Sequence, residues 1–353
     1  MSVVRTSAKA PIRAVIYGVG DMGILLTRLL LDKGVDIVGA VARSANKVGR
    51  DLGEVADLGR RLGVTITDDP AALVDDVRPD IAIMAVCSTL EAMAPHFRVC
   101  LSRGVDVLTL EEETFYPWCT SPMLAAELDA LARSQNATLT ASGAQDVYWS
   151  LGVSALMATA HRIDRVRGRS TWRADEFGPE VAGHLYIGDD PDEATHAAEA
   201  NGWGRLLGRT TLEALAACAG LTPTGWESSV NPILAASDVY SHRLSRHFPR
   251  GGVIGMAEAV RVRTAEGVDL EFETAGFVHA PDETPANEWW IDGEPDLHVL
   301  NDNLPERMIT CATAVNRVPD VLAARPGLVT VDRLPLPRYR PGILRRPRGG
   351  DGD

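Results

Sequence analysis

The first 145 residues alternate between short, continuous runs of apolar residues and segments in which apolar residues recur every three or four positions. Continuous apolar runs are typical of parallel strands buried on both faces, and the wider spacing is typical of amphipathic helices. Strands are predicted at Ile12–Tyr17, Asp36–Ala42, Val64–Thr67, Ile81–Val86, Val105–Leu110 and Thr138–Ala141, and helices at Met22–Asp32, Asp51–Leu62, Ala71–Asp75, Leu90–Ser102 and Met123–Ser134. This alternation predicts an α/β fold with a doubly wound parallel sheet.

Beyond Gln145 the pattern changes. Single alternation of apolar and polar residues, which predicts antiparallel strands with one face in water, is found at Arg165–Arg173, Ile254–Thr264 and Val268–Thr274. Helices are predicted at Trp149–Ala160, Leu212–Ala219 and Pro305–Asn316. We therefore divide the chain into a first domain at 1–146, an α+β domain with an open mixed or antiparallel sheet at 147–302, and a helix with a tail at 303–353 that packs back on the first domain.

The composition excludes several classes of protein. A net charge of −13 argues against a nucleic-acid or anionic-membrane partner. The five cysteines are scattered without a CxxC pair, which is typical of reduced thiols and predicts no metal site. Neither a signal peptide nor an apolar run of about 18 residues is found, so a cytoplasmic location is expected. The tail from Arg338 onward is rich in Pro, Arg and Gly, and we expect it to be extended or disordered.

A glycine-rich turn follows the first predicted strand directly. Gly18, Gly20 and Gly23 form a GxGxxG motif between a strand and a helix, which is the arrangement of a Rossmann dinucleotide-binding turn. The first glycine permits the tight turn, the second lets a pyrophosphate approach the backbone, and the third allows close packing of helix on strand. The helix start at Asp21 and Met22 faces the phosphates with its amide groups. The alternative is a glycine-rich turn that binds nothing.

The end of the second predicted strand indicates which dinucleotide is used. An NAD site places Asp or Glu there to accept from the ribose 2′-hydroxyl, but this chain has Ala42 followed by Arg43 and Ser44, with Lys47 shortly after. A guanidinium matches a 2′-phosphate, and a hydroxyl can donate to it as well. We therefore expect NADP (NADPH) as the cofactor, with NAD as the weaker alternative. Arg43 could instead be a solvated surface residue.

Two hydroxyl residues, Ser88 and Thr89, follow the fourth predicted strand. The carboxyl ends of parallel strands line the ligand crevice of such sheets, so these side chains are candidates for contact with the nicotinamide ribose. They could equally cap the helix that follows, and both roles are compatible.

Three consecutive acids, Glu111 to Glu113, follow the fifth predicted strand, and the aromatic residues Phe115, Tyr116 and Trp118 come directly after them. Carboxylates beside apolar rings are costly to desolvate, which points to chemistry. They could also simply open a helix, because acids stabilise a helix N-terminus by about 0.3–1 kcal/mol each. The only lysines are Lys9, Lys33 and Lys47, so no catalytic lysine is expected after residue 47.

Four segments resemble signatures of the 2,4-diaminopentanoate dehydrogenase family, which includes amine dehydrogenases. They are Lys47–Glu54, Glu112–Trp118, Ala314–Pro319 and Ala323–Leu328. The resemblance implies an enzyme that interconverts a primary amine with a ketone or aldehyde plus ammonia, using NAD(P), and that forms a homodimer through the sheets of its second domain. Where sugar-oxidising relatives of this topology have a lysine after a glutamate, this chain has a second acid, which can hold ammonia or a protonated amine.

The resemblance also implies roles for individual residues. A glutamate after the strand corresponding to Val105–Leu110 is essential in the family, and Glu112 is the match, with Glu111 and Glu113 as the alternatives one position away. Asn316, on a late helix, is placed by the family pattern near the nicotinamide. The acid that the family usually has after the second strand is missing here, which strengthens the expectation of NADP.

Aromatic residues and a histidine beyond the first domain are candidates for the substrate pocket: Tyr148, Trp149, Trp172 and His184. Each of them could instead be an ordinary core or surface residue. Trp289 and Trp290 could belong to the sheet or to the dimer contact. No arginine clamp for a carboxylate can be assigned from spacing, so simple amines and ketones are favoured as substrates.

Two other functions remain open at this point. The chain could be a reductase of an imine-containing ring of the dihydrodipicolinate type, or an NADP-binding sensor without catalysis. A sensor would bind NADPH without turnover, and a ring reductase would be indifferent to ammonia.

Overall fold

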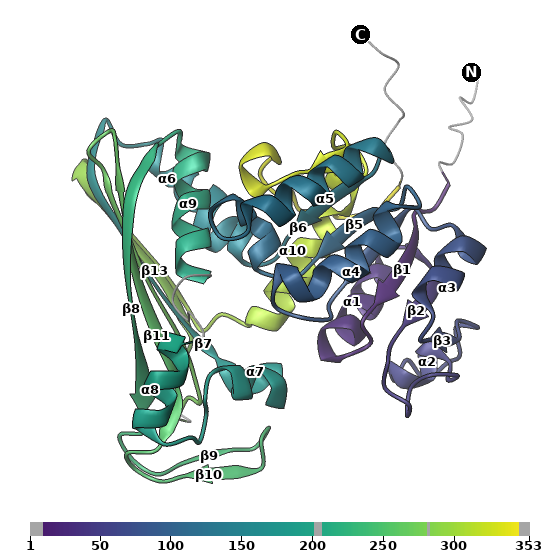
Figure 1. Ribbon diagram of the computed structural model, residues 1–353, viewed down its shortest axis with the longest axis horizontal. Coiled ribbons are helices and arrows are strands. Elements are labelled where there is room, and N and C mark those ends of the chain that lie inside the picture. The colour runs from purple at the N-terminus through teal and green to yellow at the C-terminus, as the bar shows by residue number, and fades with distance from the viewer. Residues whose placement is uncertain (1–9, 201–206, 281–282, 346–353) are drawn as a thin grey trace, which may run out of the picture. The chain divides into compact units, whose positions relative to one another are not determined.

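The computed structural model describes residues 10–200, 207–280 and 283–345, and the chain forms two compact units (Figure 1). The first unit comprises Met1–Phe115, Ser121–Gly143 and Thr310–Asp353, and the second comprises Tyr116–Thr120 and Ala144–Ile309. This division differs from the expected domains because a five-residue segment after the acids belongs to the second unit, and because the last helix is shared between the two.

The first unit is built on a seven-stranded sheet in which every strand is parallel to its neighbours. Its order is β15-β6-β5-β4-β1-β2-β3. The strands are β1 (Arg13–Tyr17), β2 (Asp36–Val41), β3 (Ile66–Thr67), β4 (Ile81–Met84), β5 (Asp106–Thr109), β6 (Thr138–Ala141) and β15 (Gly327–Leu328). The predicted doubly wound Rossmann sheet is confirmed. Its winding reverses between β1 and β4, and ligands bind at such a switch point, outside the carboxyl ends of the strands.

The helices of this unit are α1 (Asp21–Asp32), α2 (Leu52–Val55), α3 (Pro70–Val77), α4 (Leu90–Leu101) and α5 (Pro122–Ser134). One prediction was wrong, because the helix expected at Asp51–Leu62 is a single turn. Left-handed backbone at Asp57 and Gly59 ends it, and the Asp51 carboxylate instead accepts hydrogen bonds from the backbone of Gly53, Leu62 and Gly63. A buried acid organises this segment as a loop.

The second unit contains a mixed six-stranded sheet of order β14-β13-β7-β12-β11-β8. The strands are β7 (Arg162–Arg173), β8 (Pro223–Leu234), β11 (Val253–Thr264), β12 (Asp269–Phe277), β13 (Ala286–Glu294) and β14 (Leu297–Asp302), with β9 (Val239–Ser241) and β10 (Arg246–Phe248) forming a separate hairpin. The sheet is mixed, one of the two forms expected, because β7 and β12 pair in parallel although their alternation predicted antiparallel strands. The long excursion of chain between these two strands makes the parallel pairing possible.

Helices cover one face of this sheet, as the helices packed beside it in Figure 1 show. They are α6 (Gly152–Met157), α7 (Pro179–His184), α8 (Pro191–Ala200) and α9 (Leu207–Ala219). The helix predicted at Trp149–Ala160 is present, but it begins as a π-helical segment, Asp146–Leu151, and continues as α6 only to Met157. Under it, Phe272 and Trp289 stack at 5.4 Å in a buried apolar cluster.

The last helix, α10 (Glu306–Val321), continues beyond the predicted end at Asn316. After β15 the chain forms a short 3₁₀ helix, Val331–Arg333, and then has neither helix nor strand as far as residue 345; this described part of the tail is anchored in the first unit. The Leu344 side chain is buried, and its backbone N–H donates to the carbonyl of Lys33 over 2.9 Å. The Arg340 guanidinium pairs with Asp320 on α10 over 2.6 Å. Expectations for 346–353 lie outside the described residues.

Candidate active site

The glycine turn lies at the carboxyl edge of the parallel sheet, between β1 and α1. Gly18 has a left-handed φ of +101°, and a Cβ at this position would lie 2.2 Å from the carbonyl oxygen of Ala85. A Cβ at Gly23 would lie 1.9 Å from the carbonyl oxygen of Gly18. By contrast, the space above Gly20 is open, with no atom within 4 Å of a Cβ there. The turn is therefore tight on its inner side and clear on its outer side, which fits the approach of a pyrophosphate.

The residues around this turn fit a nucleotide. Gly20 is the N-cap of α1, and the first turn contains Asp21, which is exposed, and Met22, which is half-buried. Since the first amide groups of a helix have no partner within it, they can bind phosphate oxygens. The Lys47 ammonium donates to the carbonyl of Val19 over 2.6 Å, so this lysine fastens the segment after β2 to the glycine turn.

Arg43 and Ser44 lie just beyond β2 and are both exposed. The Ser44 hydroxyl donates to the side-chain oxygen of Asn46 over 2.8 Å. Arg43 makes no ion pair with any carboxylate of the described residues. An exposed guanidinium without a protein acid beside it, at the edge where the ribose of a dinucleotide binds, fits a 2′-phosphate.

The three acids after β5 have different surroundings. Glu111 is buried and its carboxylate accepts the backbone N–H groups of Glu113, at 2.5 Å, and of Thr114, at 3.0 Å, as well as the Thr114 hydroxyl. Burial raises the pKa of Glu111 to about 8, an effect that the hydrogen bonds from Thr114 oppose and the neighbouring charge of Glu112 reinforces. Glu111 thus shapes the turn after the strand.

Glu113 is also buried and also satisfied by hydrogen bonds. One carboxylate oxygen accepts from the backbone N–H of Leu90, the first residue of α4, over 2.8 Å. The other accepts from the Ser121 hydroxyl over 2.5 Å. The alternative that the acids open a helix therefore holds for Glu113, which begins the 3₁₀ helix Glu113–Phe115 and also accepts from the first N–H of α4.

Glu112 lies between these two residues and differs from both. Its side chain is exposed and accepts no hydrogen bond from any other described residue. Desolvation by the surrounding protein nevertheless raises the pKa of Glu112 to about 7. The Glu112 carboxylate is therefore partly desolvated and has no partner among the described residues. It is available to a ligand, and close to half-ionised at neutral pH.

The hydroxyls after β4 divide their roles. Thr89 is the N-cap of α4 and its hydroxyl accepts from the backbone N–H of Ala92 over 3.4 Å, whereas Ser88 is exposed. Both lie at the same edge of the sheet as Gly18 and Glu112.

Comparison with known proteins agrees with this geometry. Residues 151–346, more than half of the chain, match the model of the 2,4-diaminopentanoate dehydrogenase C-terminal domain. The chain belongs to the 2,4-diaminopentanoate dehydrogenase family. The resemblance seen in the sequence motifs is thereby confirmed.

Individual relatives span almost the whole chain. The 2,4-diaminopentanoate dehydrogenase of Acetoanaerobium sticklandii is 25% identical, over 95% of this chain and 96% of that protein. Among solved structures, the amine dehydrogenase from Mycobacterium smegmatis superimposes with a TM-score of 0.90 at 47% identity, over 94% of this chain and 98% of that one. The myo-inositol 2-dehydrogenase from Lactobacillus plantarum has a TM-score of 0.59 at 16% identity, over 92% of this chain and 93% of that one, and shares the fold alone.

In this family member, the predicted pocket residues lie in three different surroundings. Tyr148 and Trp149 belong to the π-helical segment, where the Tyr148 carbonyl accepts from Trp289 and the Trp149 ring packs on Phe272 at 5.5 Å. Trp172 lies in a separate apolar cluster and donates to the Thr274 hydroxyl over 3.3 Å. His184 is the exposed last residue of α7. Their role in substrate binding stays a prediction.

Asn316 has a structural contact that the sequence did not indicate. Its side-chain oxygen accepts from the backbone N–H of Arg340 over 3.2 Å, which ties the tail to α10. Trp289 and Trp290 both lie in β13. Among the acids' neighbours, Phe115 is buried in the first unit, while Tyr116 and Trp118 belong to the second.

A metal site and a membrane-spanning helix are both absent from the described part of the chain. Within residues 10–200, 207–280 and 283–345, no group of three or more His, Cys, Asp or Glu side chains is arranged to hold a metal ion. In the same part of the chain, no helix is both long enough and apolar enough to cross a membrane.

Proposed function

We propose that this chain is an NADP-preferring amine dehydrogenase that carries out the reversible reductive amination of a ketone or aldehyde with ammonia. Family membership and the amine dehydrogenase relatives support nicotinamide-dependent oxidoreductase activity on amines, and they favour neither the ring reductase nor the sensor. The observation that carries the residue assignment is the contrast among the acids after β5. Two of them are occupied by hydrogen bonds, and Glu112 is not.

The chemistry needs a base at this point. Bound NADPH supplies the hydride, and the acceptor carbon must first become electrophilic. Ammonia attacks the carbonyl carbon, water leaves, and the resulting iminium accepts the hydride to give the amine. The Glu112 carboxylate takes a proton from ammonium and holds the ammonia for attack. It then returns this proton to the hydroxyl that leaves as water, and as a carboxylate it stabilises the positive charge of the iminium. A pKa near 7 suits proton transfer in both directions.

The preference for NADP rests on the residues after β2. Arg43 would pair with the 2′-phosphate, Ser44 would donate to it, and Lys47 would hold the segment against the glycine turn. Gly18, Gly20 and Gly23, with the start of α1 at Asp21 and Met22, would receive the pyrophosphate. Ser88, Thr89 and Asn316 would approach the nicotinamide half. Tyr148, Trp149, Trp172 and His184 remain the candidates for contact with the substrate.

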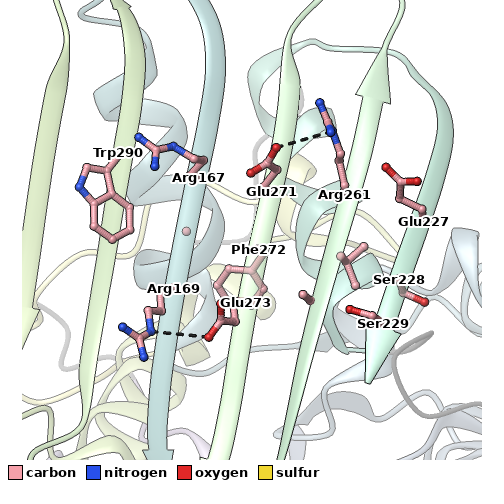
Figure 2. Close-up of a pocket in the computed structure, with 13 residues that line it drawn as sticks. Arg167, Arg169, Glu227, Ser228, Ser229, Arg261, Glu271, Phe272, Glu273 and Trp290 are labelled. Atoms are coloured by element: carbon pink, nitrogen blue, oxygen red, sulfur yellow. Dashed lines mark ion pairs between the residues drawn. The ribbon is translucent and has the colours of Figure 1, made fainter. Parts of the chain in front are cut away.

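Assembly as a homodimer is the remaining part of the proposal. The face of the six-stranded sheet away from its helices carries alternating arginines and acids, with Arg169 paired to Glu273 and Arg261 paired to Glu271 (Figure 2). A hollow of about 650 Å³ lies on this face. Because the same surface offers both signs of charge, two copies related by a two-fold axis can complement each other there. Light scattering at micromolar concentration should give twice the chain mass of 37.9 kDa, and a monomer mass would refute the dimer.

An assay of NADPH oxidation tests the activity itself. A panel of small aliphatic and cyclic ketones and aldehydes is supplied with and without ammonium, and the amine product is identified. We expect oxidation that requires both the carbonyl compound and ammonia. Binding of NADPH without turnover would instead identify a sensor, and turnover of a cyclic imine that is indifferent to ammonia would identify a ring reductase.

A further inference from the structure

A further basic side chain, which has no signature in the sequence, lies at the cofactor edge. His96 is in α4 and is half-buried. Its Nδ1 atom is 2.8 Å from the Tyr17 hydroxyl, and the two rings meet edge to face with centroids 5.2 Å apart. Tyr17 is the last residue of β1, directly before the glycine turn. The phenol thus fixes the imidazole beside the cofactor loop.

Arg43 belongs to the same cluster. Tyr17 is paired with Val41 in the sheet, and the backbone N–H of Gly18 donates to the Val41 carbonyl over 2.9 Å, so the segment that carries Arg43 begins beside Tyr17. The charge of Arg43 acts on both side chains. Burial raises the pKa of Tyr17 above its usual range and Arg43 opposes this rise, whereas burial and Arg43 together lower the pKa of His96. Three side chains from β1, α4 and the segment after β2 therefore gather at the place where the adenosine half of a dinucleotide passes.

Among the described residues, no acid forms an ion pair with Arg43 or His96. α3 and α5 also pack against α4, but Asp75 of α3 is paired with Arg103 and Glu127 of α5 is paired with Arg98. His96 itself makes no ion pair with a described carboxylate. The groups that act on His96 are therefore a neutral phenol and a guanidinium, which leaves positive potential without a counter-charge.

We propose that His96, held in place by Tyr17, is a second ligand for the 2′-phosphate of NADP alongside Arg43, and that it makes the choice between NADPH and NADH depend on pH. The proposal rests on the NADP preference argued above and deepens it. It assigns the discrimination between NADPH and NADH to two basic groups from different segments: Arg43, which is always charged, and His96, which titrates.

The charges around His96 determine whether its ring is protonated. Burial and the charge of Arg43 lower the pKa of His96, so without cofactor the ring is neutral at neutral pH. With Nδ1 accepting from Tyr17, the other ring nitrogen carries the hydrogen and can donate. A phosphate between Arg43 and His96 reverses the sign of the local field and favours the imidazolium. Binding of NADPH should therefore be coupled to uptake of a proton, and binding of NADH should not.

The test compares His96→Gln with the parent by fluorescence titration of NADPH and NADH at pH 6 and pH 8.5. Glutamine can still donate a hydrogen bond but cannot become charged, so it imitates the neutral ring. At pH 6 the variant should bind NADPH at least about tenfold more weakly, the scale of one charge-assisted hydrogen bond. At pH 8.5 the loss should be within about twofold. The 2′-phosphate also titrates near pH 6, but this effect cancels when variant and parent are compared at one pH.

The controls distinguish a failure of the role proposed for His96 from a failure of the NADP preference on which it rests. NADH affinity should be unchanged at both pH values, which also shows that the variant is folded. His196→Gln, an exposed substitution on α8, should change neither affinity. Equal losses for NADPH and NADH, or a loss for NADPH that does not depend on pH, would overturn the role of His96. If Arg43→Ala fails to weaken NADPH selectively in the same titration, the proposed NADP preference fails, whatever the result for His96.

Discussion

Charged side chains are used in opposite ways in two regions of this molecule. On the open face of the six-stranded sheet, exposed arginines and acids are matched, as in the pairs Arg169–Glu273 and Arg263–Glu227. At the carboxyl edge of the parallel sheet, Glu112 and Arg43 are exposed but have no charged partner among the described residues. Charged side chains are dense on the sheet face and sparse at the carboxyl edge. It is nevertheless the carboxyl edge that offers a ligand charged groups without a partner among the described residues.

We infer from this difference that charged side chains without a partner, rather than a large number of charges, mark the candidate active site. An exposed ion pair contributes about 0–1 kcal/mol and has already satisfied both of its members. A carboxylate with no partner, surrounded by enough protein to raise its pKa to about 7, keeps its capacity to accept a proton or an ammonium ion. Glu111 and Glu113 illustrate this within three residues, because burial and hydrogen bonds have made them parts of the fold.

The largest predicted effect comes from removing the unoccupied acid. Glu112→Gln is nearly isosteric and removes only the charge, so reductive amination should fall by at least about 10²-fold while the Kd for NADPH is retained. Steady-state kinetics with saturating ammonium, together with a cofactor titration, measure both. If the rate of Glu112→Gln stayed within a few-fold of the parent rate, the lack of a hydrogen-bond partner at Glu112 would have no catalytic meaning.

The unoccupied arginine gives the next largest effect. Arg43→Ala should raise the KM for NADPH about ten- to hundredfold and leave that for NADH nearly unchanged, because the lost interaction is a charged hydrogen bond of about 1.5–3 kcal/mol. A matched control is Arg133→Ala, which removes a paired, exposed arginine from α5 of the same unit. Equal changes in the two KM values for Arg43→Ala would place this arginine with the solvated surface charges.

The occupied acids should respond in stability rather than in activity. Glu113→Leu keeps the side chain close to its size but removes both acceptor oxygens, which leaves the Leu90 N–H and the Ser121 hydroxyl without their partner. We expect the free energy of unfolding to fall by about 1–3 kcal/mol, measured by denaturant titration, with kcat of the folded enzyme within a few-fold of the parent. Loss of activity in a variant of unchanged stability would show that the catalytic acid is Glu113.

The sequence predicted the parallel sheet well because its strands are continuous apolar runs and its turns are marked by glycine. It was less informative for the second sheet. β8 contains Pro, Gly and several exposed polar residues, so it has no apolar alternation to detect, and the parallel pairing of β7 with β12 depends on a long connection rather than on either strand. The helix predicted at Asp51–Leu62 does not extend beyond one turn, because the buried Asp51 carboxylate accepts hydrogen bonds from the backbone of Gly53 and Leu62 in place of helical bonds.

The candidate site divides in the same way. The glycine motif and the three acids are local in sequence and could be found there. Which acid is unoccupied depends on Leu90 and Ser121, which lie 23 residues before and 8 residues after Glu113. The contact of Tyr17 with His96 spans 79 residues and has no local signature. Partners brought together by tertiary structure determine whether a charged residue is structural or available, and only the three-dimensional structure identifies them.

The pH dependence of reductive amination is the sharpest test of Glu112 as the base, when it is measured in the parent and in Glu112→Gln at a fixed concentration of ammonium. A raised pKa means that the Glu112 carboxyl is protonated, and unable to act as a base, below about pH 7. The rate of the parent should therefore rise as pH increases through about 7, and this ionisation should be absent from the slow Glu112→Gln variant. An identical rise near pH 7 in both proteins would contradict the account, because the ionisation would then belong to another group.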